Sequence, residues 1–173
     1  MSRHRFYGAE DRFEVLADFI AERYWERRCG QRVHYIADVA GGQGMLARIL
    51  TKKYHFACEV IDPRGWVLKG IQNRAEEFNP ELARFYDLIV GLHCDEALRQ
   101  VAACARIRPV ILVPCCNFWS DEKLGQFELL EAIEAYYREQ GVKFERVTFG
   151  FKGPKNIGLV SEPANWHFGS SNV

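Results

Sequence analysis

Hydrophobic and polar positions along the chain follow two patterns, a helical spacing and short continuous apolar runs. Between residues 10 and 28, apolar side chains recur three and four positions apart, which predicts an opening amphipathic helix. Mostly apolar runs predict buried strands at residues 33–39, 56–61, 87–92 and 110–114. Helical spacing returns between and after these runs, at residues 45–50, 95–105 and 122–140.

The remaining segments complete an alternating order of strands and helices. Residues 142–149 and 156–161 predict two closing strands, and residues 66–70 fit either a weak helix or a short third strand. Buried strands that alternate with helices are typical of a parallel sheet covered on both faces. We therefore expect an α/β fold, a doubly wound Rossmann-like sheet of about seven strands, mostly parallel with an antiparallel C-terminal hairpin.

The length and composition favour one domain. We expect the 173 residues to form a single unit with an N-terminal helix at 10–28, a core at 33–161 and a C-terminal tail at 162–173. No apolar run approaches the ~20 residues that a membrane helix needs, so we expect a cytoplasmic protein with no membrane partner. The six cysteines include the adjacent pair Cys115 and Cys116, and their spacing favours reduced thiols over a disulfide framework.

The charge balance argues against a freestanding nucleic-acid binder. The chain has 23 Lys and Arg residues and 23 Asp and Glu residues, so it lacks the basic field typical of that class. Arginines gather near the N-terminus, Arg12 among them, but the acids between them fit a solvated helix face. Lys152 and Lys155 flank a turn between the closing strands that fits phosphate contacts or an exposed hairpin tip.

A glycine-rich turn follows the first predicted strand. Gly42 and Gly44 let the backbone approach a ligand closely, and the next helix offers free N–H groups at its start. Asp62 follows the second strand, 18 residues beyond Gly44, where a carboxylate can accept hydrogen bonds from ribose hydroxyls. Together these features predict a cofactor that contains a ribose.

The same turn fits a nicotinamide dinucleotide, because residues 42–47 satisfy the pattern G-x-G-x-x-A. Asp38 argues against this alternative. A carboxylate four residues before Gly42 is poorly placed beside a pyrophosphate but well placed near a cationic amino-acid group. We therefore expect a ligand that carries positive charge.

The segment D-V-A-G-G-Q-G at 38–44 resembles the first motif of class I S-adenosylmethionine-dependent methyltransferases, D/E-x-G-x-G-x-G, with Ala40 at the first glycine. The resemblance implies that Asp62 binds the ribose of S-adenosylmethionine and that Asp38 and the glycine turn bind its methionine portion. The family's acid after the third strand, which faces adenine, has no clear match near Arg74. The expected cofactor-binding residues are Asp38, Ala40, Gly41, Gly42, Gly44, Asp62, Pro63 and Leu92.

The loops after the fourth and fifth predicted strands form the candidate acceptor site. Their sequences, L-H-C-D-E-A-L at 92–98 and P-C-C-N-F-W at 114–119, are similar to loops of methyltransferases that include a tRNA ribose methyltransferase family. The resemblance implies an RNA acceptor, tRNA or rRNA, modified on a ribose hydroxyl or a base amino group. A hydroxyl needs a base such as His93 or Asp95, and an amine needs an acceptor such as Asp95 or Asn117. These three residues are the expected catalytic set.

Several alternatives stay open. Asp95 also fits the N-cap of the helix that follows it. His93 and the cysteines offer the ligands of zinc, but adjacent ligands fit a tetrahedral site poorly, so we expect no metal. Cys115 or Cys116 as a covalent nucleophile is a further alternative to packing. A small-molecule methyltransferase is the main alternative to an RNA enzyme, and a non-enzymatic domain that binds cofactor or a partner protein is the third. The RNA hypothesis requires a partner protein or the N-terminal arginines to deliver the RNA.

Overall fold

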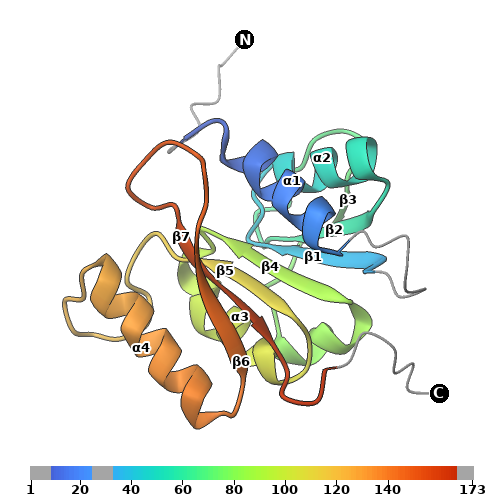
Figure 1. Cartoon of the computed structure of the whole chain (residues 1–173). Helices are drawn as coiled ribbons and strands as arrows, with labels where there is room; N and C mark the ends of the chain where they lie inside the picture. The colour runs from blue at the N-terminus through green and yellow to red at the C-terminus, as the bar shows by residue number, and fades with distance from the viewer. Residues whose placement is uncertain (1–8, 25–32, 167–173) are drawn as a thin grey trace.

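The computed structural model describes residues 9–24 and 33–166, in which seven strands form one mixed sheet of order β3-β2-β1-β4-β5-β7-β6 (Figure 1). The strands are β1 (Tyr35–Val39), β2 (Ala57–Ile61), β3 (Gln72–Arg74), β4 (Leu88–Leu92), β5 (Val110–Val113), β6 (Lys143–Thr148) and β7 (Ile157–Glu162). The first five strands pair in parallel, and β7 runs antiparallel between β5 and β6. The predicted fold class is confirmed.

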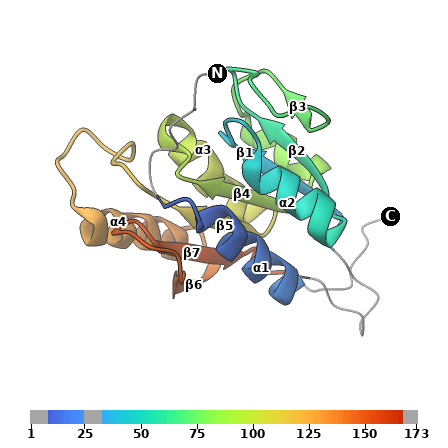
Figure 2. The ribbon, with the colours of Figure 1, turned by 90° about the horizontal axis from the view of Figure 1, so that it is seen from above.

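Helices cover both faces of the sheet (Figures 1 and 2). The α-helices are α1 (Arg12–Tyr24), α2 (Met45–Tyr54), α3 (Leu98–Ala103) and α4 (Gln126–Glu139), and short 3₁₀ turns are η1 (Pro80–Phe85), η2 (Asp95–Ala97) and η3 (Cys104–Arg106). The core under α1 and α2 is separate from the core under α3 and α4. Within the ranges that the structure describes, no helix has the length and apolar character needed to cross a bilayer.

The central strands are mostly apolar because both of their faces are buried, with Asp38 of β1 as a buried exception. In β4, Leu88 and Val90 pack under α1 and α2, whereas Ile89 packs on the opposite face. This burial explains why the sequence shows mostly apolar runs at these strands rather than alternation. It also places the polar residues that follow each strand at the carboxyl edge of the sheet.

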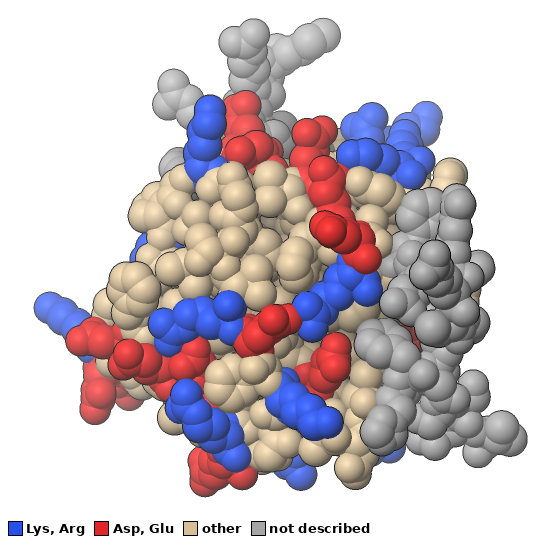
Figure 3. Space-filling view, in the orientation of Figure 1, with Lys and Arg blue, Asp and Glu red and all other residues tan. Residues whose placement is uncertain are grey.

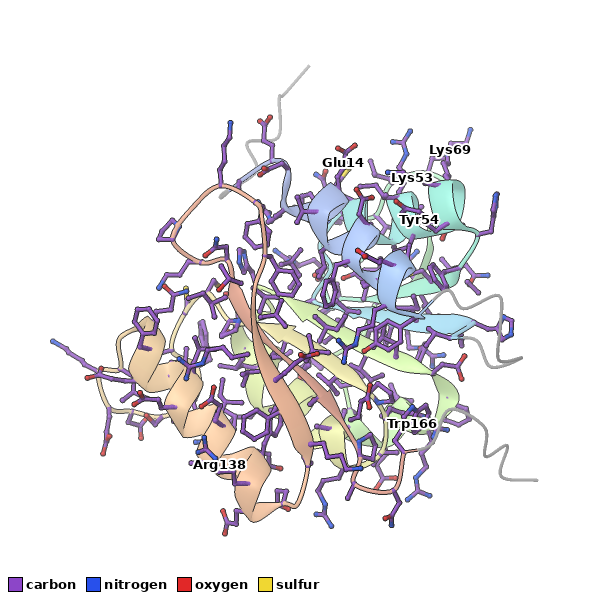
Figure 4. The ribbon with its side chains drawn as sticks, in the orientation of Figure 1. Glu14, Lys53, Tyr54, Lys69, Arg138 and Trp166 are labelled. Carbon is purple, nitrogen blue, oxygen red and sulfur yellow. The ribbon has the colours of Figure 1, made fainter. Side chains whose placement is uncertain are left out.

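Polar contacts join α1 to α2 beside their shared core. Lys53 Nζ donates to Asp18 Oδ1 at 2.9 Å, and the Tyr54 hydroxyl donates to the same oxygen. Figure 4 labels Lys53 and Tyr54 at the end of α2 next to α1. An exposed ion pair stabilises little, so the fully buried Leu16 and Ile20 contribute most to holding α1 on the sheet. The position of α1 matters because its first turn reaches the edge where the cavities lie.

Two predicted elements differ from the structure in the middle of the chain. Residues 66–70 form neither helix nor strand, and the third strand comes later, at Gln72–Arg74. All three β3 residues are exposed and polar, which explains the absence of a hydrophobic signal. The helix predicted at 95–105 is a succession of η2, α3 and η3.

Two predicted helix boundaries are also corrected. The helix predicted at 122–140 begins at Gln126, where the backbone N–H of Gly125 donates to the Glu128 carboxylate at 2.7 Å and fixes the first turn. The opening helix begins at Arg12, and the predicted end at 25–28 lies outside the described residues.

The described cysteines, Cys58, Cys94, Cys104, Cys115 and Cys116, are free thiols, and Cys29 lies outside the described residues.

Both edges of the sheet are polar. The edge strand β3 has three exposed residues, and the opposite edge strand β6 exposes Lys143, Glu145 and Arg146. Arg146 Nε donates to the buried Glu134 of α4 at 2.7 Å, which ties this edge to a helix.

Candidate active site

A cavity of about 910 Å³ opens at the carboxyl ends of the central strands. Residues within 38–45 line it from the glycine turn, and residues of 92–95 and 115–116 line it from the loops after β4 and β5. Arg12 and residues 151–155, in the loop between β6 and β7, enclose it from the other side. Because β4 and β5 are paired neighbours, the two predicted acceptor loops meet at one cavity as expected.

A second cavity of about 470 Å³ lies next to the first and shares Ala40, Arg64, His93 and Asp95 with it. The predicted cofactor-binding residues that line one or both cavities are Asp38, Ala40, Gly41, Gly42, Asp62, Pro63 and Leu92. The second cavity also contains Phe78, whose ring adds apolar surface that the sequence analysis did not assign to the site. The two cavities together offer an elongated site along the carboxyl edge of the sheet.

The glycine turn has steric reasons for two of its glycines. A Cβ on Gly41 would lie 2.4 Å from the Asp38 carboxylate. Gly44 has φ +78°, and a Cβ there would lie 2.9 Å from Val60 Cγ2. Gly44 therefore packs against the core beneath the turn and is not among the residues that line either cavity. Its predicted contact with a cofactor stays a prediction.

Ala40 occupies a left-handed conformation, with φ 53°. Its backbone N–H donates to the Ile61 carbonyl at 2.8 Å, which links the end of β1 to the end of β2. Left-handed backbone is costly for a residue with a Cβ, so this position favours glycine on conformational grounds. The departure at the first glycine of the motif is therefore accommodated with strain, and the shape of the turn is kept.

Asp38 is a buried carboxylate at the floor of the main cavity. Asp38 is 2% exposed, and its Oδ2 has no hydrogen-bond partner among the described residues. Burial raises the pKa of Asp38 to about 7, a hydrogen bond from the Ala47 backbone opposes the rise, and the charge of Asp62 adds to it. A positively charged ligand group beside Oδ2 would remove this cost.

Asp62 is paired with neighbouring groups of the protein. Its carboxylate accepts four hydrogen bonds, from the backbone N–H groups of Gly42 and Arg64 and from Nε and Nη2 of the Arg64 side chain. Although burial opposes the effect, these bonds lower the pKa of Asp62. The role of Arg64 was missed from the sequence, where the available signal is its position in the turn Asp62-Pro63-Arg64.

His93 and Asp95 line both cavities, and both have left-handed backbone, with φ 56° and 42°. His93 Nε2 lies 3.0 Å from the Lys155 carbonyl. Because a carbonyl only accepts, Nε2 carries the proton and Nδ1 is the acceptor nitrogen of the neutral ring. Burial lowers the pKa of His93, against the opposing effect of the Lys155 carbonyl. The ring is therefore neutral near pH 7, as a base must be.

Asp95 contacts the cysteine pair. Cys115 Sγ lies 3.0 Å from Asp95 Oδ1 and 3.4 Å from Cys116 Sγ, so one potential ligand atom of each residue lies within 4.8 Å of the others. Burial and the hydrogen bond to Asp95 raise the pKa of the Cys115 thiol, which disfavours a covalent nucleophile at neutral pH. The N-cap position of η2 is occupied by Cys94 rather than by Asp95.

The structure does not bring Asn117 into either cavity. Its Oδ1 accepts hydrogen bonds from the backbone N–H groups of Trp119 and Ser120, at 3.1 and 3.3 Å. Its side-chain amide donates to the Ser120 and Glu122 carbonyls. These bonds favour a role in shaping the loop after β5, and the predicted catalytic role has no geometric support.

No protein-family model matches the sequence, and the search of curated proteins finds no match. Solved structures do match. DesVI of Streptomyces venezuelae is 16% identical with a TM-score of 0.55, over 88% of this chain and 90% of that chain. The plantazolicin methyltransferase BpumL in complex with SAH is 13% identical with a TM-score of 0.55, over 88% and 86% of the two chains. The N-terminal domain of EvdMO1 with SAH bound is 10% identical with a TM-score of 0.51, over 88% and 80%. This chain therefore has the Rossmann-like methyltransferase fold.

Proposed function

We propose that this protein is an S-adenosylmethionine-dependent methyltransferase that acts on a small-molecule acceptor. The observation that carries the proposal is the Asp38 carboxylate, which is buried, has no hydrogen-bond partner for Oδ2 among the described residues, and belongs to a residue that lines the cavity at the glycine turn. A dinucleotide would place phosphate near this carboxylate, whereas S-adenosylmethionine places its ammonium group there. Two structures of similar fold contain SAH, the demethylated cofactor product, which supports the same choice.

The residues of the site fit this cofactor. Asp38 would hold the amino-acid portion, and Asp62 would accept hydrogen bonds from the ribose after Arg64 moves aside. Phe78 and Pro63 line the second cavity, where they offer apolar contact to an adenine ring. S-adenosylmethionine supplies a methyl group on a sulfonium centre, so that the departing sulfur is neutral.

The protein's own part in the reaction is to orient the acceptor and to take its proton. Alignment alone can supply ~7–11 kcal/mol of barrier lowering. Neutral His93 directs its proton toward the Lys155 carbonyl and keeps Nδ1 as a base for a hydroxyl or amine proton. Asp95, on the same loop, is the second candidate base.

A small acceptor is favoured over RNA by the form and charge of the protein. The part of the main cavity beside His93 and Asp95 is also lined by Arg12 of α1 and by the loop after β6. Acidic and basic side chains are intermixed on the face shown in Figure 3. Net charge is zero over the sequence, which gives no general attraction for a polyanion. The RNA acceptor implied by the loop motifs stays a prediction without support from the similar structures.

Calorimetric titration with S-adenosylmethionine, SAH and NAD tests the cofactor assignment. Binding of the first two and not of NAD supports the proposal, and Asp38→Asn and Asp62→Asn should each weaken SAH binding. Asp121→Asn, which removes an exposed carboxylate outside both cavities, is the matched control and should bind as wild type does. NAD binding, or unchanged SAH affinity in both site variants, would contradict the proposal.

Transfer of labelled methyl groups to small molecules and to tRNA, measured over a range of salt concentrations, separates the acceptor classes. Phosphate contacts to RNA weaken steeply as salt rises, so RNA methylation would fall sharply. Methylation of a small acceptor should respond far less.

A further inference from the structure

Positive charge gathers at the outer end of the main cavity. Arg12, at the start of α1, and Lys152 and Lys155, on the loop between β6 and β7, line this end from one side. Asp95 lies across the cavity on the loop after β4, and Asp38 lies deeper at the glycine turn. Asp11 also lies at this end, where its carboxylate accepts a hydrogen bond from the Lys152 backbone N–H at 3.4 Å. Three cations against two nearby acids leave this end a small net positive charge, which attracts an anionic group.

Arg12 is unusual among these cations because it is buried. The residue is 9% exposed, and its Nε has no hydrogen-bond partner among the described residues. Its Nη1 donates to the Ala9 carbonyl at 3.0 Å, and the guanidinium lies 4.3 Å from the centre of the Phe13 ring. A buried charged donor without a partner is costly, and a guanidinium suits the planar geometry of an acidic group. Arg12 therefore offers an unpaired hydrogen-bond donor, Nε, to an acidic group of a ligand.

Electrostatic effects place Arg12 at the acceptor end of the cavity. Burial is the main cause that lowers the pKa of His93, and the charge of Arg12 lowers it further. The pKa of Arg12 itself falls through burial, with Cys115 opposing that fall. The charge that acts on Asp38 is instead that of Asp62. The charge of Arg12 therefore acts on groups of the loops after β4 and β5, which line the same cavity.

The surfaces around Arg12 are apolar. Phe13 and Phe151 line the same end of the cavity, and Phe151 is buried with its ring near that of His93, at 6.3 Å between centroids. We infer that the acceptor is a small organic acid, whose acidic group binds Arg12 while its apolar body lies between Phe13 and Phe151. This inference rests on the proposed function, because it names the acceptor of that methyl transfer.

Benzoate and benzamide are suitable probes, since they share a shape and differ in charge. Each is titrated into the protein with and without saturating SAH. We expect benzoate to bind more tightly than benzamide, and Arg12→Gln to lower benzoate affinity by about tenfold or more, as loss of a charge-assisted contact should. Arg12→Lys keeps the charge without the planar fork and should bind with intermediate affinity. Arg48→Gln removes an exposed arginine of α2 outside the cavity and should leave benzoate binding unchanged.

A second pair of titrations identifies which acid Arg12 holds. SAH has a methionine-type carboxylate, whereas methylthioadenosine lacks it. Equal SAH affinity in wild type and Arg12→Gln supports the acceptor assignment. A loss of SAH affinity with unchanged methylthioadenosine affinity would assign Arg12 to the cofactor carboxylate and overturn the inference, as would benzoate binding that is absent in wild type or retained in Arg12→Gln. Failure of SAH to bind wild type would instead remove the proposed function, and the titration of benzoate without SAH would still test the anion site.

Discussion

Replacement of Asp38 by asparagine should make the stability of the protein less sensitive to pH. In the folded protein, burial raises the pKa of this carboxyl to about 7, whereas an unfolded chain has an Asp pKa of about 3.9. Between these values the folded state holds a proton that the unfolded state has released. The contribution of Asp38 to stability is therefore greatest at low pH and is lost as pH rises through this window.

The size of the effect follows from the two pKa values. At about 1.4 kcal/mol for each pH unit, the cost of the wild-type carboxyl is about 1.5 kcal/mol at pH 5 and about 4 kcal/mol at pH 8. The free energy of unfolding of Asp38→Asn, compared with that of wild type, should thus rise by about 2.5 kcal/mol between these pH values. A constant offset from the buried amide cancels in this comparison.

Urea unfolding of the ligand-free proteins at pH 5 and pH 8 measures this difference. Asp121→Asn, on an exposed loop, serves as the control and should track wild type at both pH values. If the gap between Asp38→Asn and wild type is the same at both pH values, Asp38 does not titrate in this window and the argument from burial is wrong. The same variant should bind SAH more weakly, so that stability is gained where affinity is lost.

Three further substitutions test the turn and its ion pair. Ala40→Gly should raise the free energy of unfolding, measured in urea, by about 1 kcal/mol, because the strain that glycine relieves outweighs its greater freedom in the unfolded chain. A destabilised variant would show that packing of the Ala40 methyl group stabilises the turn. Gly44→Ala should lower the free energy of unfolding by about 2–3 kcal/mol, because the alanine Cβ would collide with Val60 and the left-handed backbone at this position disfavours alanine. A stability equal to that of wild type would mean that the turn can relax. Arg64→Gln should raise SAH affinity about fivefold, because it removes a side chain that competes with the ribose for Asp62. This factor corresponds to a free energy of about 1 kcal/mol for the Arg64–Asp62 ion pair, whose arginine is 63% exposed. Weaker SAH binding in calorimetry would place Arg64 in contact with the cofactor.

The order of the fold could be predicted because most strands are buried on both faces. Mostly apolar runs indicated β1, β2, β4 and β5, and the glycine turn indicated the passage into α2. The strand β3 carries no apolar residue, so that backbone pairing with β2 determines its position. That pairing is a tertiary event which local patterns do not record.

The candidate site was only partly predictable for a related reason. Asp38 lies near the end of β1, and Asp62 and His93 directly follow β2 and β4. The rule that ligands bind at the carboxyl edge of such a sheet indicated all three. Arg12 comes from a helix far away in sequence, and its charge looked like one of many on a solvated face. Only the docking of α1 makes it a buried cavity residue. The prediction of a catalytic role for Asn117 did not anticipate local contacts, because backbone groups nearby in sequence form hydrogen bonds with its side chain.

The polar edges of the sheet bear on how copies of this protein behave together. An edge strand exposes backbone groups that can pair with another chain, and long flat apolar edges are those that associate. Here β3 offers only three residues, and β6 presents Lys143, Glu145 and Arg146 along its length. A second copy that paired with β6 would have to bury its charged side chains, and one that approached β3 would find too short a strand to pair with. Continuation of the sheet from one molecule into the next is thus disfavoured, and concentrated protein should resist strand-mediated aggregation.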